Sequence, residues 1–332
     1  MIIEPFASKN RQVLTQHLNI RKFRSNKIFK ITVIAAAGYT LLMVALVIYA
    51  VANGSSLIFS HEGISFITGT DWNAVEGRES FGALPYIIGT LVSAGIAMAI
   101  GVPISLGIAI FITEMSPSRF VAPLSFIIEV LAAVPSIIYG LWALFVFRFW
   151  IRDLIELPLY NAFHQFPLFA QYPFGLDVFT AGIVLAIMII PIVSSICREV
   201  MKVVPNSQRE AAYSLGATRW ETVKTAVIPY AKSGILGAAI LGLGRAVGET
   251  MLVTLIIGNV IGIAAIPTSL FSQSQTLSSL IANEFNEAAS DLHLSALIGL
   301  GAVLLVLTIA INVVAQIMVK RMVKVPSGDK NA

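Results

Sequence analysis

An arginine and a glutamate lie four residues apart inside a long apolar stretch of this sequence. Arg245 and Glu249 interrupt a run of Gly, Ala, Leu and Ile that begins at Gly234. A guanidinium in hydrocarbon costs about 2.5–3.5 kcal/mol on insertion scales, so it is kept only where protein or water surrounds it. Its planar fork can donate two parallel hydrogen bonds to a tetrahedral oxyanion. We interpret the two residues as an anion contact in or beside a pathway. The alternative is an ion pair along one helix face that locks a bundle.

The neighbouring residues indicate which face of the helix carries this pair. At about 100° per residue, four small residues spaced by four positions form one stripe: Gly234, Ala238, Gly242 and Ala246. This spacing predicts close packing of a second helix. Because Arg245 and Glu249 fall in the same angular sector, we expect both charges to point into a protein interface or a water-filled path. Glu129, in another apolar stretch, is a further candidate for the pathway; its alternative role is to partner polar groups near one membrane surface.

Long membrane-spanning elements must position these residues. Of the 332 residues, 57% are hydrophobic and 12% are charged, against roughly 25% charged residues in soluble domains. One crossing needs about 20 apolar residues. The sequence therefore predicts an all-α membrane protein with six transmembrane helices, at residues 31–52, 86–112, 121–147, 178–197, 234–262 and 295–319. Proline is tolerated in such helices, and we expect kinks at Pro103, Pro135 and Pro191.

The distribution of positive charge predicts the orientation of these helices. Eighteen of the 22 Lys and Arg residues fall on one side of the six spans and three fall on the other. Basic residues collect on the cytoplasmic side, so both termini are expected there. The expected organisation is a basic cytoplasmic segment at 1–30, a transmembrane domain at 31–320 with a cytoplasmic loop at 198–233, and a cytoplasmic tail at 321–332. The net charge of +4 is thereby explained by membrane topology and lipid contact, without a nucleic-acid partner.

The cytoplasmic loop carries signals for two short helices. Ser207 with Glu210, and Thr218 with Glu221, have the spacing of capping boxes, which start helices. Gly216 stands where the first of these helices must end, since glycine adopts the left-handed cap without strain. The loop is therefore expected to form two helices joined by a sharp glycine turn.

The same loop resembles the signature loop of bacterial ABC-importer permeases. Its residues Glu210-Ala211-Ala212, Gly216 and Pro229 match the spacing of that motif, and Ala226-Val227-Ile228 departs mildly from the usual Ile-x-Leu before the proline. The resemblance implies that the loop docks on a cytoplasmic ATPase and transmits its motion. Small side chains at Ala211 and Ala212 suit a close approach, and Arg209, Glu210 and Arg219 would offer charges to the partner.

A second resemblance is more specific. The segment from Leu241 to Met251, which contains Gly-Arg-Ala-Val-Gly-Glu-Thr, is similar to the permeases of phosphate-specific importers, more to the PstC-type subunit than to the PstA-type. Residues 131–140 and 282–288 are also similar to that family. The resemblance implies a type I permease bundle in the bacterial inner membrane, paired with a PstA-type permease, two ATPase subunits and a periplasmic phosphate-binding protein. In it, Arg245 and Glu249 match intramembrane charges linked to phosphate passage.

Other functions remain as alternatives. A permease for another oxyanion, molybdate or sulfate, would keep the same architecture. An enzyme is disfavoured, since the predicted spans contain no histidine and His61 and His164 lack metal-ligand spacing. No glycine is followed by lysine, which excludes a P-loop, so no cofactor is expected here and ATP would be bound by a partner subunit. A passive channel or scaffold leaves the docking loop unexplained.

Overall fold

The computed structural model describes the backbone of residues 5–322 and the side chains of residues 27–319. Most of the expected tail, 321–332, and the first four residues of the expected segment 1–30 lie outside this range. Residues 1–53 and 54–332 form two units, each described by itself. The first is built from helix α1 (Pro5–Gly54). Its stretch Lys27–Gly54 has a mean hydropathy of 2.4, and its side chains are exposed from residue 27 to 50. Such an apolar surface requires lipid or protein around it.

The described residues contain five helices long and apolar enough to cross a membrane, and a sixth crossing if one bent helix pair counts as a single span. The five are Lys27–Gly54, Leu84–Met115, Val178–Lys202, Arg219–Gly248 and Asp291–Val319. The bent pair is Ser118–Ala132 with Ser136–Phe163. The chain is thus a multi-pass helical membrane protein.

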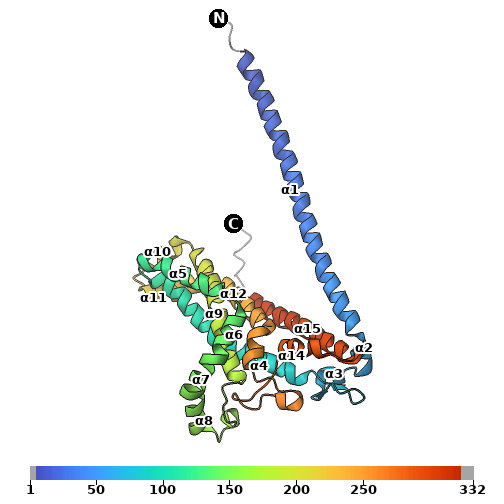
Figure 1. The fold of residues 1–332 in the computed structure, drawn as a ribbon. Coiled ribbons are helices and arrows are strands. Elements are labelled where there is room, and N and C mark those ends of the chain that lie inside the picture. Colours follow the sequence, from blue (N-terminus) through green and yellow to red (C-terminus); the bar gives the residue numbers. More distant parts are fainter. Residues whose placement is uncertain (1–4, 323–332) are drawn as a thin grey trace. The chain divides into compact units, whose positions relative to one another are not determined.

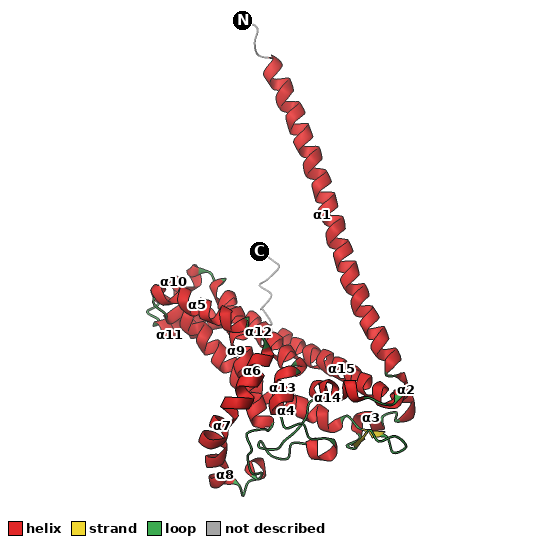
Figure 2. Ribbon diagram, in the orientation of Figure 1, coloured by secondary structure: helices red, strands yellow, loops and turns green. Residues whose placement is uncertain are grey.

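The second unit is almost entirely helical (Figures 1 and 2). Its helices are α2 (Ser56–His61), α3 (Ser65–Thr68), α4 (Leu84–Ile110), α5 (Ser118–Ala132), α6 (Ser136–Trp142), α7 (Arg148–Ile151), α8 (Leu157–Phe163), α9 (Val178–Lys202), α10 (Asn206–Ser214), α11 (Arg219–Thr222), α12 (Ile228–Gly248), α13 (Met251–Ile256), α14 (Leu277–Glu284) and α15 (Asp291–Met322). Short π-helical turns extend several of them, namely η1 (Phe111–Met115), η2 (Ala143–Phe147), η3 (Arg152–Glu156) and η5 (Val223–Val227). Three short 3₁₀ turns are η4 (Pro167–Phe169), η6 (Gly262–Ala265) and η7 (Phe285–Glu287).

A small hairpin departs from the all-α expectation. Strands β1 (Trp72–Asn73) and β2 (Ser80–Phe81) pair antiparallel, with Trp72 opposite Phe81. Both aromatic rings are buried and in edge contact, and Tyr86 packs on Trp72 from α4. The hairpin places both rings in a core shared with α4 and α15, a contact between distant residues that sequence periodicity does not report.

Helices α4, α9 and α12 form the packed centre of the second unit. Glycines let their backbones approach closely. A Cβ at Gly101 of α4 would lie 2.9 Å from Ile189 of α9, and one at Gly242 of α12 would lie 2.7 Å from Val193. Both distances are shorter than real Cβ contacts. Without a hydrophobic force between helices in lipid, this kind of close packing is what holds them together.

The third predicted span, 121–147, is wrong as a single helix, whereas the kink expected at Pro135 is confirmed. The chain bends by 88° between α5 and α6, at Pro135, which has no N–H to donate and clashes with a preceding turn. Helices α4 and α9 continue through Pro103 and Pro191. The half-helix α5 has no buried residue, so it is only lightly covered by the rest of the chain.

The fifth predicted span, 234–262, is also wrong in its bounds. The apolar helix begins at Arg219, inside the expected loop, and ends at Gly248. Glu249 has extended backbone angles, φ −71° and ψ 128°, and a separate short helix, α13, follows. The sequence is apolar on both sides of Glu249 and Thr250, and hydropathy alone therefore predicts one continuous span.

Candidate functional site

The structure separates Arg245 from Glu249. Arg245 lies in the last turn of α12, with its side chain exposed, whereas Glu249 has left the helix. No ion pair joins them in the part of the chain that the structure describes. The alternative interpretation, an ion pair along one helix face, is therefore wrong, because the helix ends one residue before the glutamate.

Arg245 instead lies at the C-terminal end of α12, and Glu249 lies just before the N-terminal end of α13. A cation at a helix C-terminus and an anion at an N-terminus interact favourably with the backbone dipoles. The carboxylate of Glu249 accepts a hydrogen bond from the backbone N–H of Leu252 in α13, at 3.4 Å. The backbone carbonyl of Glu249 accepts a hydrogen bond from the Ser278 hydroxyl of α14, at 2.8 Å. The glutamate is thus held by neighbouring backbone and side chains, and the guanidinium is left open.

The small-residue stripe and the arginine occupy different faces of α12. Ala238, Gly242 and Ala246 are buried, and Gly234 is half-buried against Val200 of α9. On the other face, Gly237, Gly244 and Gly248 have open space where a Cβ would stand, and Leu241 is 60% exposed. Arg245 is exposed with this open face, so the expectation that it shares the packed sector of the stripe is wrong. The neighbour α9 covers only one side.

The breaks in the third and fifth spans pack against each other. Helix α13 lies against α6, where a Cβ at Gly140 would come within 3.0 Å of the Leu252 Cα. Discontinuous helices facing one another are a recurrent feature of substrate sites in transporters. The charged residues at the end of α12 therefore stand beside a pair of interrupted helices.

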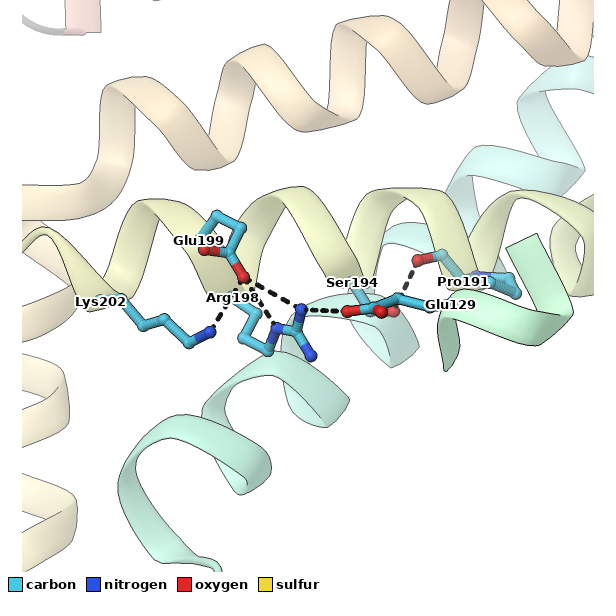
Figure 3. Close-up of polar contacts among 6 residues, drawn as sticks. All are labelled: Glu129, Pro191, Ser194, Arg198, Glu199 and Lys202. Atoms are coloured by element: carbon cyan, nitrogen blue, oxygen red, sulfur yellow. Dashed lines mark hydrogen bonds and ion pairs between the residues drawn. The ribbon is translucent and has the colours of Figure 1, made fainter. Parts of the chain in front are cut away.

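Glu129 is paired with an arginine that the sequence interpretation assigned to the loop at 198–233. Arg198 lies inside α9, 4% exposed, and its Nη2 donates to Glu129 Oε1 at 2.9 Å. Figure 3 shows the guanidinium between Glu129 of α5 and Glu199, whose Oε1 also accepts a bond from Lys202. The apolar stretch ends one residue before Arg198, so hydropathy placed the helix end too early.

The cytoplasmic segment forms the two helices and the glycine turn expected from its sequence. Gly216 has φ +83° and ends α10. The N–H of Gly216 bonds Tyr213 O at 2.9 Å, and that of Ala217 bonds Ala212 O at 3.2 Å, the pattern of a Schellman cap. The Thr218–Glu221 capping box is present. The predicted box at Ser207 is wrong, since α10 begins at Asn206 after Pro205 with no side-chain cap.

A hollow of about 730 Å³ lies between these helices. Four of the predicted coupling residues line it, namely Ala211, Ala212, Gly216 and Pro229. Exposed Glu210 and Arg219 lie outside its lining. In Figure 1, α10 and α11 lie together at one end of the second unit, and α7 and α8 lie at another. The segment thus offers a small-residue cavity with an open mouth.

Arg209 does not offer its charge to a partner, contrary to the sequence interpretation. Its Nε and Nη2 bond the two carboxylate oxygens of Glu114 at 3.2 and 2.8 Å. Its Nη1 donates to Val204 O at 2.5 Å and its Nη2 to Met201 O at 3.0 Å. Both side chains are largely buried. A bidentate pair of this kind fixes orientation as well as charge, so it ties α10 to the end of the second span and to the end of α9.

A second buried polar cluster lies at the far end of α9. Asp177 caps α9 by accepting from Thr180 N at 2.8 Å, and the Thr180 hydroxyl donates to Glu156 at 2.7 Å. Burial, together with the adjacent Glu156 carboxyl, raises the pKa of Asp177 well above its usual range. Among the described residues no group of His, Cys, Asp and Glu could hold a metal ion.

Residues 101–324 match the family model described as binding-protein-dependent transport system inner membrane component. The chain belongs to this family. Related proteins are similar to this chain over most of the length of both chains. The phosphate transport system permease protein PstC of Pasteurella multocida is 45% identical over 90% of this chain and 92% of its own. The protein of the same name from Haemophilus influenzae is 44% identical, over 89% and 93%.

A solved structure shares the fold of this chain. A bacterial alginate ABC transporter in complex with an alginate pentasaccharide-bound periplasmic protein contains a chain that matches 86% of this one and 94% of its own length. The TM-score is 0.56 at 16% identity. The likeness concerns the architecture of the membrane helices.

Proposed function

We propose that this chain is one permease subunit of an ATP-driven phosphate importer. It lies in the bacterial inner membrane with both termini in the cytoplasm and supplies half of the translocation pathway. The observation that carries the proposal is Arg245, exposed on the open face of α12, in a chain 45% identical to a phosphate transport permease. A guanidinium kept in an apolar helix needs a polar partner, and a tetrahedral oxyanion matches its two-pronged donor geometry.

The geometry supports different roles for the two charged residues. Arg245 would contact the passing anion, since no protein group in the described residues pairs with it. Glu249, which is hydrogen-bonded to α13 and α14, would lie beside the pathway. Its carboxylate would accept a hydrogen bond from the P–OH group of a hydrogen phosphate. The open face of α12, with its three uncovered glycines, would meet a homologous PstA-type permease and complete the pathway.

The cytoplasmic segment would couple this pathway to ATP hydrolysis. A dimeric ATPase subunit would bind the exposed side of α10 and α11, filling the hollow lined by Ala211, Ala212, Gly216 and Pro229, with Glu210 and Arg219 exposed for charge contacts. Motion of the ATPase would reach the membrane helices through Arg209 and Glu114. A periplasmic phosphate-binding protein would deliver the cargo. The subunit itself performs no bond chemistry.

The test is binding-protein-dependent uptake of labelled phosphate by the whole complex in vesicles. The proposal expects ATP-dependent uptake that a tenfold excess of sulfate or molybdate leaves nearly unchanged. Uptake of either of those anions in preference to phosphate would overturn the assignment of the cargo. The names of the relatives favour phosphate over both.

A further inference from the structure

Arg198 has a hydrogen-bonding capacity that the protein leaves unused. Its Nε and Nη2 are bonded to Glu199 and Glu129. Its Nη1 is buried and has no partner among the described residues. An unpaired buried N–H of a charged group costs more than about 1–3 kcal/mol. A membrane protein that keeps one at the inner end of a span has a use for a second acceptor there.

The carboxylate that occupies this arginine is itself open to the surroundings. Glu129 is 59% exposed, and it comes from α5, the half-helix without buried residues. The pair is therefore covered on the Arg198 side and uncovered on the Glu129 side. Charges do not face lipid without compensation, so the uncovered side faces water or another protein chain.

The position of Arg198 relative to Arg245 follows from helix packing. Gly242 of α12 meets Val193 of α9, and Gly234 meets Val200, so the two helices run antiparallel. Arg198 lies between those contacts, and Arg245 lies three residues beyond Gly242. At ~1.5 Å per residue the two arginines are staggered by about 12 Å along the helix axis. Arg198 is the one nearer the cytoplasmic segment.

We propose that Arg198 is a second, inner contact for the transported oxyanion and that Glu129 occupies it between passages. This inference rests on the proposed function. An arriving phosphate displaces the carboxylate of Glu129 and gains the guanidinium, including the unused Nη1. The returning carboxylate then competes the anion off. Conduction needs sites that bind a substrate firmly enough to admit it and weakly enough to release it. Competition from the Glu129 carboxylate would lower the affinity of Arg198 for phosphate to that range.

The test measures equilibrium binding of labelled inorganic phosphate to the complete complex in nanodiscs, without binding protein or ATP. Glu129→Gln is expected to bind phosphate about fivefold more tightly than the wild type. In this variant the phosphate no longer competes with the Glu129 carboxylate for Arg198, and an ion pair with an exposed partner is worth up to about that factor. The same variant should take phosphate up more slowly in vesicles, because release is slowed. Adding Arg198→Lys to Glu129→Gln should remove the gain in binding.

Two comparisons make the outcome decisive. Asp153→Asn, which breaks the arginine–carboxylate pair with Arg152 away from this site, should leave phosphate binding unchanged. Glu129→Asp, which shortens the carboxylate while keeping its charge, should give an intermediate gain if Glu129→Gln does not assemble. Binding by Glu129→Gln that equals or falls below the wild type would overturn the inference. If the wild-type complex transports no phosphate at all, it is the proposed function that fails.

Discussion

Arg245 and Arg209 show two opposite ways of keeping an arginine at the edge of a helix bundle. Arg209 is largely buried and donates four hydrogen bonds, two to the Glu114 carboxylate and two to backbone carbonyls. Arg245 is exposed on the open face of α12 and has no ion-pair partner in the described residues. The difference teaches that Arg209 is satisfied by partners inside the chain, whereas Arg245 stays available for the anion contact proposed above.

The largest effect should come from removing the open arginine. Arg245→Gln is expected to reduce phosphate uptake about 100-fold or more, since two charge-assisted hydrogen bonds to the anion are worth roughly 3 kcal/mol. The complex should still assemble, because no described side chain depends on Arg245. Uptake by reconstituted vesicles measures the first point and size-exclusion chromatography the second. Arg245→Lys, which keeps the charge without the fork, should lose less. Normal uptake by Arg245→Gln would contradict a contact with the anion.

Breaking the buried arginine should affect coupling more than the pathway. Arg209→Lys keeps a positive charge but loses the bidentate geometry and at least one carbonyl bond. We expect transport per ATP hydrolysed to fall about tenfold, because an imperfectly paired buried charge costs a few kcal/mol and loosens α10. Parallel assays of phosphate uptake and ATP hydrolysis give this ratio. Lys224→Gln, an exposed change in the same segment, is the control. An unchanged ratio in Arg209→Lys would exclude the proposed linkage.

The glycine turn between α10 and α11 offers a smaller perturbation of the same linkage. Gly216 has φ +83°, and nothing lies within 4 Å of where its Cβ would be. Gly216→Val should therefore destabilise the turn through backbone strain rather than through a steric clash, at a cost of about 1–3 kcal/mol. Transport per ATP should fall roughly three- to tenfold. Gly216→Asn should stay near the wild-type value, since asparagine tolerates this conformation. Equal losses in the two variants would show that strain is not the cause.

The smallest effect concerns stability at the far end of α9. The pKa of Asp177 is raised in the folded protein by burial and by Glu156. Its contribution to stability is then fully present below its unfolded pKa and is lost as pH rises through the folded value. Asp177→Asn keeps the cap on Thr180 and removes the titration. We expect the thermal midpoint of the variant to exceed that of the wild type by about 2–4 °C at neutral pH, and the gap to shrink toward pH 4. A gap independent of pH would refute this account.

Sequence reasoning succeeded for two local signals, although the equally local signal at Ser207 misled it. The turn at Gly216 and the capping box at Thr218 follow from the backbone needs of a few adjacent residues, and both are present. It failed where a contact joins distant residues. Nothing near Arg209 in the chain points to Glu114, and nothing near Glu129 points to Arg198. A possible signal for the second pair was the position of Arg198 directly after the apolar stretch, within one turn of the predicted helix.

The sequence by itself determined that this is a helical membrane protein of an importer-permease family, because hydropathy and short motifs depend only on neighbouring residues. The tertiary structure alone decided where those helices break, which arginines are covered and which are open. Those outcomes depend on which helix lies alongside which, as when α9 covers one face of α12 and leaves Arg245 on the other. The type of a side chain determines its chemistry, but the neighbours that the fold packs against it determine whether it is exposed to a ligand.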